Sequence, residues 1–176
     1  LNESHQQNFD KLIVFLTQLK KNSKLIDLHT LATASHILSA LPQDKIFPIL
    51  DIIRLLIAHS PTAAIFFVKK QNILNFTSPE KWQQLSKGAK LMFLRILCNI
   101  YKYVDGILKQ NIADQLELII YFAINTITSK TSSLALTASA LLCNIALSNM
   151  VKPESDEEAD MISAIVELIG TSGMIN

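Results

Sequence analysis

The sequence predicts an all-α protein, a right-handed solenoid of armadillo- or HEAT-like helical repeats. Apolar residues recur at spacings of three and four along nearly the whole chain, whereas the alternation typical of strands is almost absent. Prolines divide this pattern into helix-sized segments, because proline removes a backbone donor and clashes with the preceding turn. The string LCNI occurs twice, and its asparagines, Asn99 and Asn144, are separated by a period typical of armadillo and HEAT units.

The composition indicates one intracellular domain spanning residues 1–176. A chain of 176 residues fits a single domain that buries roughly 70% of its unfolded surface. Lys and Arg number 16 and Asp and Glu 15, so the net charge of +1 gives no overall attraction for nucleic acid. Cys98 and Cys143 each lie in an apolar run, which favours buried thiols in a reducing compartment over disulfides. We therefore expect a cytoplasmic protein, with the nucleus as a second location.

Helices are expected over residues 6–20, 27–41, 47–60, 62–69, 79–86, 89–104, 111–128, 132–149 and 155–170. The first begins in a polar stretch that lacks the apolar core of a signal peptide, so the chain looks like a segment of a longer protein. Pro48 and Pro61 mark the starts of the third and fourth helices. Ser78-Pro79-Glu80 supplies the fifth with an N-cap, a proline at the first helical position and an acid near the positive helix end.

Three features of the sequence bear on the later helices: a glycine, a charge-free stretch and an acidic run. Asp105-Gly106 is the expected stop of the helix over 89–104. Residues 131–151 carry no charge and are about as long as a membrane span, but Ser, Thr and Asn spread through them favour the central helix of a soluble solenoid. The acidic residues after Pro153 are interpreted as stabilising the N-terminus of the last helix, and an acidic docking motif is the alternative interpretation.

Several predicted helices are apolar nearly all round except for one narrow polar strip. On the helix over 89–104 this strip consists of Arg95, Asn99 and Lys102, at positions i, i+4 and i+7. The corresponding strips on other helices are Asp51 and Arg54; Ser133, Thr137, Asn144 and Ser148; and His29, Thr33 and His36. A helix covered by neighbours on most sides leaves such a strip open to water, and successive strips of a solenoid join into a groove. We therefore expect a binding groove for an extended ligand.

Four segments occur in order along the chain: FPILDIIRLL from Phe47, followed by His59; KLMFLRILCN from Lys90; LALTA from Leu134; and LLCNIA from Leu141. Together they resemble the PUL domain found at the C-terminus of the phospholipase A-activating protein family. The resemblance covers about residues 35–170, and FPxLDxxR is its most specific part. It implies an armadillo-like array whose groove binds the acidic, tyrosine-bearing C-terminal tail of the AAA ATPase valosin-containing protein, in ubiquitin-dependent processes.

The resemblance implies Arg54 as a groove cation, with Arg95 and Asn99 on the next repeat and Asn144 on the one after. A guanidinium offers forked donors that suit a carboxylate, and a surface Asn can bond a peptide backbone through both its donor and its acceptor. Lys102 and His36 complete the candidate set, because they lie in the same polar strips. PUL domains continue with further repeats, including another arginine-bearing segment. Since this chain ends at Asn176, we expect a truncated domain or a shorter groove, with weaker tail binding or none.

The candidate residues also have structural interpretations that the sequence leaves open. Arg54 can pair with Asp51 one turn earlier, and Asn144 can cap or bridge neighbouring helices. His36 has no second ligand at metal spacing, so packing or solvent exposure is favoured over zinc. Cys98 and Cys143 are expected to face the core. A helical scaffold or oligomerisation domain without a peptide groove is the alternative function.

Catalytic motifs are absent from the sequence. It contains no HExxH, GxSxG or Walker-type motif, and four glycines are too few for a phosphate cradle. Lysines are scattered, without the basic and aromatic stripe of a nucleic-acid groove. We therefore expect a protein-binding module that is no enzyme and uses no metal or cofactor.

Overall fold

In a computed structural model, the described residues are 7, 10, 13, 14 and 17 and the ranges 26–70, 73–104, 106–129, 131–148 and 155–172. These residues form α-helices and two short 3₁₀ helices, with no strand among them. The prediction of an all-helical repeat solenoid is confirmed. The helix expected over 6–20 lies largely outside the described residues, and those described within it are helical.

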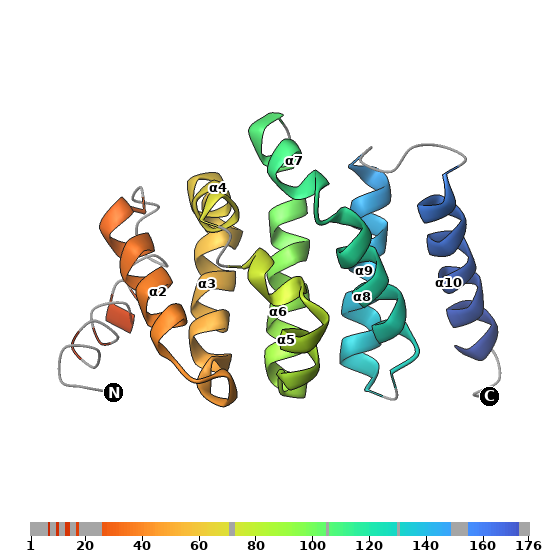
Figure 1. The fold of residues 1–176 in the computed structure, drawn as a ribbon, viewed down its shortest axis with the longest axis horizontal. Helices are drawn as coiled ribbons and strands as arrows, with labels where there is room; N and C mark the ends of the chain where they lie inside the picture. Colours follow the sequence, from red (N-terminus) through yellow and green to blue (C-terminus); the bar gives the residue numbers. More distant parts are fainter. Residues whose placement is uncertain are drawn as a thin grey trace.

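The helices follow one another in a row along the longest axis of the molecule, with α2 and α10 at its two ends (Figure 1). Their bounds are α2 Leu28–Ala40, α3 Phe47–His59, α4 Pro61–Lys69, α5 Pro79–Gln84, α6 Lys87–Tyr101, α7 Gly106–Ala113, α8 Leu116–Ile127, α9 Ser132–Leu147 and α10 Asp156–Ser172. The 3₁₀ helices are η1 Gln43–Lys45 and η2 Leu74–Thr77. Most of these bounds lie within two residues of those expected from the sequence.

Serine side chains start three consecutive helices. The hydroxyl oxygens of Ser60, Ser78 and Ser86 accept hydrogen bonds from the third backbone amide of α4, α5 and α6, at 3.3, 3.4 and 3.2 Å. The N-cap predicted at Ser78 is thus confirmed. Ser86 caps α6, which begins two residues earlier than expected.

The single helix predicted over 111–128 is wrong, because two helices, α7 and α8, occupy this region. A turn separates them, in which the backbone N–H of Gln115 donates to the carbonyl of Ile112 at 2.9 Å. The two helices pack on different neighbours: α7 on α4, and α8 on α9 and α10. One straight helix could not make both sets of contacts. Gly106, the expected helix stop, instead begins α7 with a positive φ of 43°, a conformation that favours glycine.

The inner row of the solenoid consists of α3, α6 and α9. Each packs directly on the next, and α8 packs on α9 (Figure 1). The units α4–α5–α6 and α7–α8–α9 each end in a helix of this row, and their first helices, α4 and α7, contact each other. The two LCNI strings lie at equivalent places on α6 and α9, so the sequence repeat corresponds to one step of the row.

The core extends along the whole row and is linked by aromatic rings. Trp82 of α5 stacks on Phe122 of α8 at 5.0 Å between ring centroids, and its ring meets the edge of Phe93 of α6 at 5.7 Å. Trp82 is buried, and Phe93 is almost completely so. These three residues hold the outer helices α5 and α8 against the inner row.

One side of α9 is uncovered, contrary to expectation. Leu136 is 69% and Leu147 80% exposed, and Cys143 between them is exposed as well. The prediction that Cys143 faces the core is therefore wrong, and so is the prediction that α9 is covered on most sides. Cys98, at the equivalent place on α6, is half-buried because α9 packs over it. α10 packs mainly on α8, so it leaves this side of α9 open.

Candidate partner-binding face

The candidate residues on α3, α6 and α9 form a connected face, here called the inner face and defined by Asp51, Arg54, Arg95, Asn99, Lys102 and Asn144. Arg54 is held at two points. Its Nε donates to Asp51 Oδ1 at 2.7 Å, one turn earlier on α3. Its backbone carbonyl accepts a hydrogen bond from Asn99 Nδ2 of α6 at 3.1 Å. Arg54 therefore forms the Asp51 pair that the sequence allowed, and it is also fixed to the next helix of the row.

Asn99 and Asn144 make equivalent contacts one repeat apart. Asn144 Nδ2 of α9 donates to the carbonyl of Cys98 of α6 at 3.4 Å, just as Asn99 Nδ2 donates to the carbonyl of Arg54. Each asparagine thus joins its own helix to the preceding helix of the row. The bridging interpretation of Asn144 agrees with this geometry, and Asn99 bridges neighbouring helices in the same way. No hydrogen bond of the described residues uses the Oδ1 atom of either side chain.

A hollow of about 560 Å³ lies where α6 and α9 end. It brings together Asn99, Lys102 and Asn144 of the candidate set, with Ser148 beside them. Lys102 is exposed, and its Nζ lies 5.3 Å from the centre of the Tyr103 ring, a cation–π contact. The carbonyls at the ends of both helices give this region negative partial charge, which a cation such as Lys102 offsets.

Arg95 is an exposed cation of the inner face. It lies on α6 one turn before Asn99, and it forms no ion pair with the described residues. Its charge acts on the neighbouring thiol: burial raises the pKa of Cys98 to about 11, and the nearby guanidinium partly opposes that rise. The inner face holds three cations, Arg54, Arg95 and Lys102, against the single carboxylate of Asp51, so it has an excess of positive charge.

His36 is not part of this arrangement. It is exposed on α2, which packs on α3 and α4 and lies outside the α3–α6–α9 row. Tyr103, in contrast, was missed by the sequence analysis. Its hydroxyl donates to the carbonyl of Ala58 of α3 at 3.0 Å and so ties the end of α6 to α3. Its spacing of four residues from Asn99 was the signal that could have identified it.

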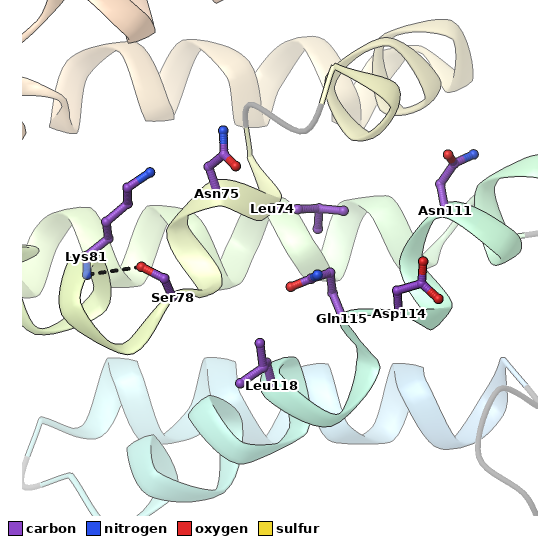
Figure 2. Close-up of a pocket in the computed structure, with 8 residues that line it drawn as sticks. All are labelled: Leu74, Asn75, Ser78, Lys81, Asn111, Asp114, Gln115 and Leu118. Carbon is purple, nitrogen blue, oxygen red and sulfur yellow. Dashed lines mark hydrogen bonds between the residues drawn. The ribbon is translucent and has the colours of Figure 1, made fainter.

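A second hollow, of about 250 Å³, lies among the outer helices (Figure 2). Its lining comes from η2, α5, α7 and α8, and none of its residues belongs to the candidate set. Ser78 is engaged there in capping α5, as the dashed line to Lys81 in Figure 2 marks. Asp114 and Lys81 contribute opposite charges, so this hollow has no excess of either sign to select a ligand.

The described part of the chain lacks two further kinds of feature. No group of three His, Cys, Asp or Glu side chains there could hold a metal ion. None of the helices described there has the length and apolar character needed to span a membrane.

Comparison with known proteins gives one result for nearly the whole chain. The family model described as the PUL domain matches residues 1–174. No curated protein and no solved structure matches the chain.

Proposed function

This chain belongs to the PUL domain family of protein–protein interaction modules, and from that premise we propose that its inner face binds the acidic C-terminal tail of the AAA ATPase valosin-containing protein. The proposed role is that of an adaptor in ubiquitin-dependent processes. It acts by binding, without catalysis, in the cytoplasm and also in the nucleus.

The observation that carries the proposal is the pair of arginines on consecutive helices of the row. Arg54 of α3 is fixed at its side chain and its backbone, and Arg95 of α6 is exposed without an ion pair among the described residues. Two guanidinium groups on one face offer forked donors to successive carboxylates of an extended peptide. Lys102 adds a third positive charge near the end of α6.

The asparagines support binding of the peptide backbone between those charges. Asn99 and Asn144 are only partly buried, and each uses its Nδ2 group to hold the preceding helix. Their Oδ1 atoms are therefore available as acceptors for peptide N–H groups. This spacing along α6 and α9 suits an extended ligand that crosses the row.

Isothermal titration of the tail peptide into the purified chain tests the proposal. We expect binding that weakens several-fold as salt rises from roughly 50 to 300 mM, because exposed charges are screened at that ionic strength. A peptide of equal length with its acidic residues replaced by Gln and Asn is the control. Equal affinity for both peptides, or no binding of either, would overturn the proposal.

A scaffold without a peptide groove is the second candidate. The observation that favours it is that Asn99, Asn144 and Tyr103 all bond neighbouring helices of the protein itself. A scaffold of this kind would bind neither peptide, so the same titration separates the two functions.

A further inference from the structure

We infer that Asp51 is a positioning residue, which orients the Arg54 guanidinium for a ligand carboxylate rather than neutralising it. This inference rests on the proposed function, because it concerns how the same face recognises acidic ligands. The observation behind it is which guanidinium nitrogen of Arg54 donates to the carboxylate of Asp51.

The ion pair uses the inner nitrogen of the guanidinium. Asp51 Oδ1 accepts from Arg54 Nε at 2.7 Å, and among the described residues no other acceptor bonds the Arg54 side chain. A guanidinium carries one N–H on Nε and four on its two terminal nitrogens. The terminal pair, which forms the end-on fork with a carboxylate, therefore stays unused.

Arg54 is also held from the side of its backbone. The Asn99 bond to its carbonyl fixes its place on α3 relative to α6, and the Asp51 bond fixes the direction of its side chain. Only 25% of the Arg54 side chain is exposed, against 42% of Asp51, so the arginine is confined along most of its length. A confined side chain loses less conformational freedom on binding, which increases affinity.

The competing interpretation is that Asp51 occupies the site as an internal substitute for the ligand. The two interpretations predict opposite signs. If Asp51 competes, its removal frees Arg54 and makes the face more positive, so an acidic peptide binds more tightly. If Asp51 positions Arg54, its removal lets the guanidinium reorient, and the peptide binds more weakly in spite of the added positive charge.

Two substitutions at this position separate charge from geometry. Asp51→Ala removes both the charge and the acceptor, and alanine is well tolerated within a helix. Asp51→Asn removes the charge but keeps an oxygen that can accept from Nε. We expect Asp51→Ala to weaken binding of the tail peptide about tenfold, which is the size of effect expected from ordering one long side chain on binding. We expect Asp51→Asn to stay within about threefold of the unaltered chain.

A double-substitution comparison shows whether the effect passes through Arg54. In an Arg54→Ala background, Asp51→Ala should change the affinity less than twofold, because no guanidinium remains to be oriented. Melting temperatures measured on the same samples exclude a loss of fold as the cause. A structural role alone would lower the melting temperature and would show no dependence on Arg54.

The outcomes distinguish failure of the positioning role from failure of the proposed function. Tighter binding by Asp51→Ala, or equal weakening with and without Arg54, would overturn the positioning role while the proposed function stands. A complete lack of peptide binding by the unaltered chain would overturn the proposed function, and the positioning role would fall with it.

Discussion

The side-chain amide of Asn99 donates to the backbone carbonyl of Arg54, 45 residues earlier in the chain, at 3.1 Å. This bond joins the most specific family segment, on α3, to the central helix of the row. One repeat later Asn144 makes the equivalent bond to Cys98. Packing of the solenoid and presentation of the candidate cations therefore depend on the same residues, and their contributions to stability and to binding can be measured separately.

Charge reversal at Arg95 is expected to weaken binding without loss of fold. Arg95→Glu should cost on the order of 2 kcal/mol of affinity for the acidic tail peptide, because attraction becomes repulsion at this position of the inner face. Since the Arg95 side chain is exposed, the melting temperature of the variant should equal that of the unaltered chain. Titration calorimetry and thermal unfolding of one preparation measure both quantities.

Lys81→Glu is the matched control for this change of charge. Lys81 is exposed on α5, away from the inner face, and glutamate at this position completes a capping box with Ser78. The variant carries the same net charge as Arg95→Glu and should bind the peptide like the unaltered chain. Equal loss of affinity in both variants would show that overall charge, and not the inner face, governs binding.

The bridging asparagines are expected to contribute to stability unequally. Asn99→Ala should lower the free energy of unfolding by about 1 kcal/mol, because a hydrogen bond between two helices is lost. Asn144→Ala should cost less, since its bond is longer, at 3.4 Å against 3.1 Å. Asn125→Ala is the control: Asn125 is exposed, and within the described part of the chain its side chain bonds the carbonyl of Tyr121 on the same helix and no other helix. If urea unfolding showed the same loss of stability for Asn125→Ala as for Asn99→Ala, the bridging role would be contradicted.

Burial of Cys98 predicts a loss of stability at alkaline pH. The pKa of this thiol rises from 9.0 to about 11 on folding, so the unfolded chain ionises first as pH increases. The contribution to stability is complete below pH 9 and is lost as pH rises towards 11. Between these limits the unaltered chain should lose roughly 2 kcal/mol more than Cys98→Ala does. Parallel pH profiles of urea unfolding measure the difference, and superimposable profiles would refute this prediction.

Trp82 is expected to be the most costly single truncation among the residues discussed. Trp82→Ala removes a buried ring that contacts Phe93 and Phe122 on two other helices, so we expect a loss of about 3–5 kcal/mol. Trp82→Phe keeps an aromatic ring and should lose clearly less. A loss below about 1 kcal/mol on Trp82→Ala would mean that this cluster does not hold the outer helices to the row.

Much of the fold could be predicted from the sequence, because its signals are local. Pro48, Pro61 and Pro79 each lie at the first or second position of a helix, as expected from the missing donor of proline. The two LCNI strings identified α6 and α9 as equivalent helices. The break between α7 and α8 was not predictable in this way, because it follows from the different neighbours of the two helices and not from a local breaker residue.

The sequence predicted part of the candidate face but not the contacts that its residues make. Helical spacing placed Arg95 and Asn99 on one strip, and the structure joins Asn99 to Arg54 and brings Asn99, Lys102 and Asn144 to one hollow. Helical period cannot show which side of a helix lacks a neighbour. Cys98 and Cys143 occupy the same place in the two LCNI strings, yet one is half-buried and the other exposed. Among the described helices, a further one packs on that side of α6 but not of α9.

Binding of the tail peptide at the inner face is tested by an NMR titration that observes the residues of this face. Arginine Nε and asparagine side-chain amide signals are recorded while the acidic tail peptide is added to the chain. If the inner face binds the peptide, the signals of Arg54, Arg95, Asn99 and Asn144 shift together with one dissociation constant, while that of Asn125 stays unchanged. Shifts confined to other surfaces, with these four residues unaffected, would contradict it.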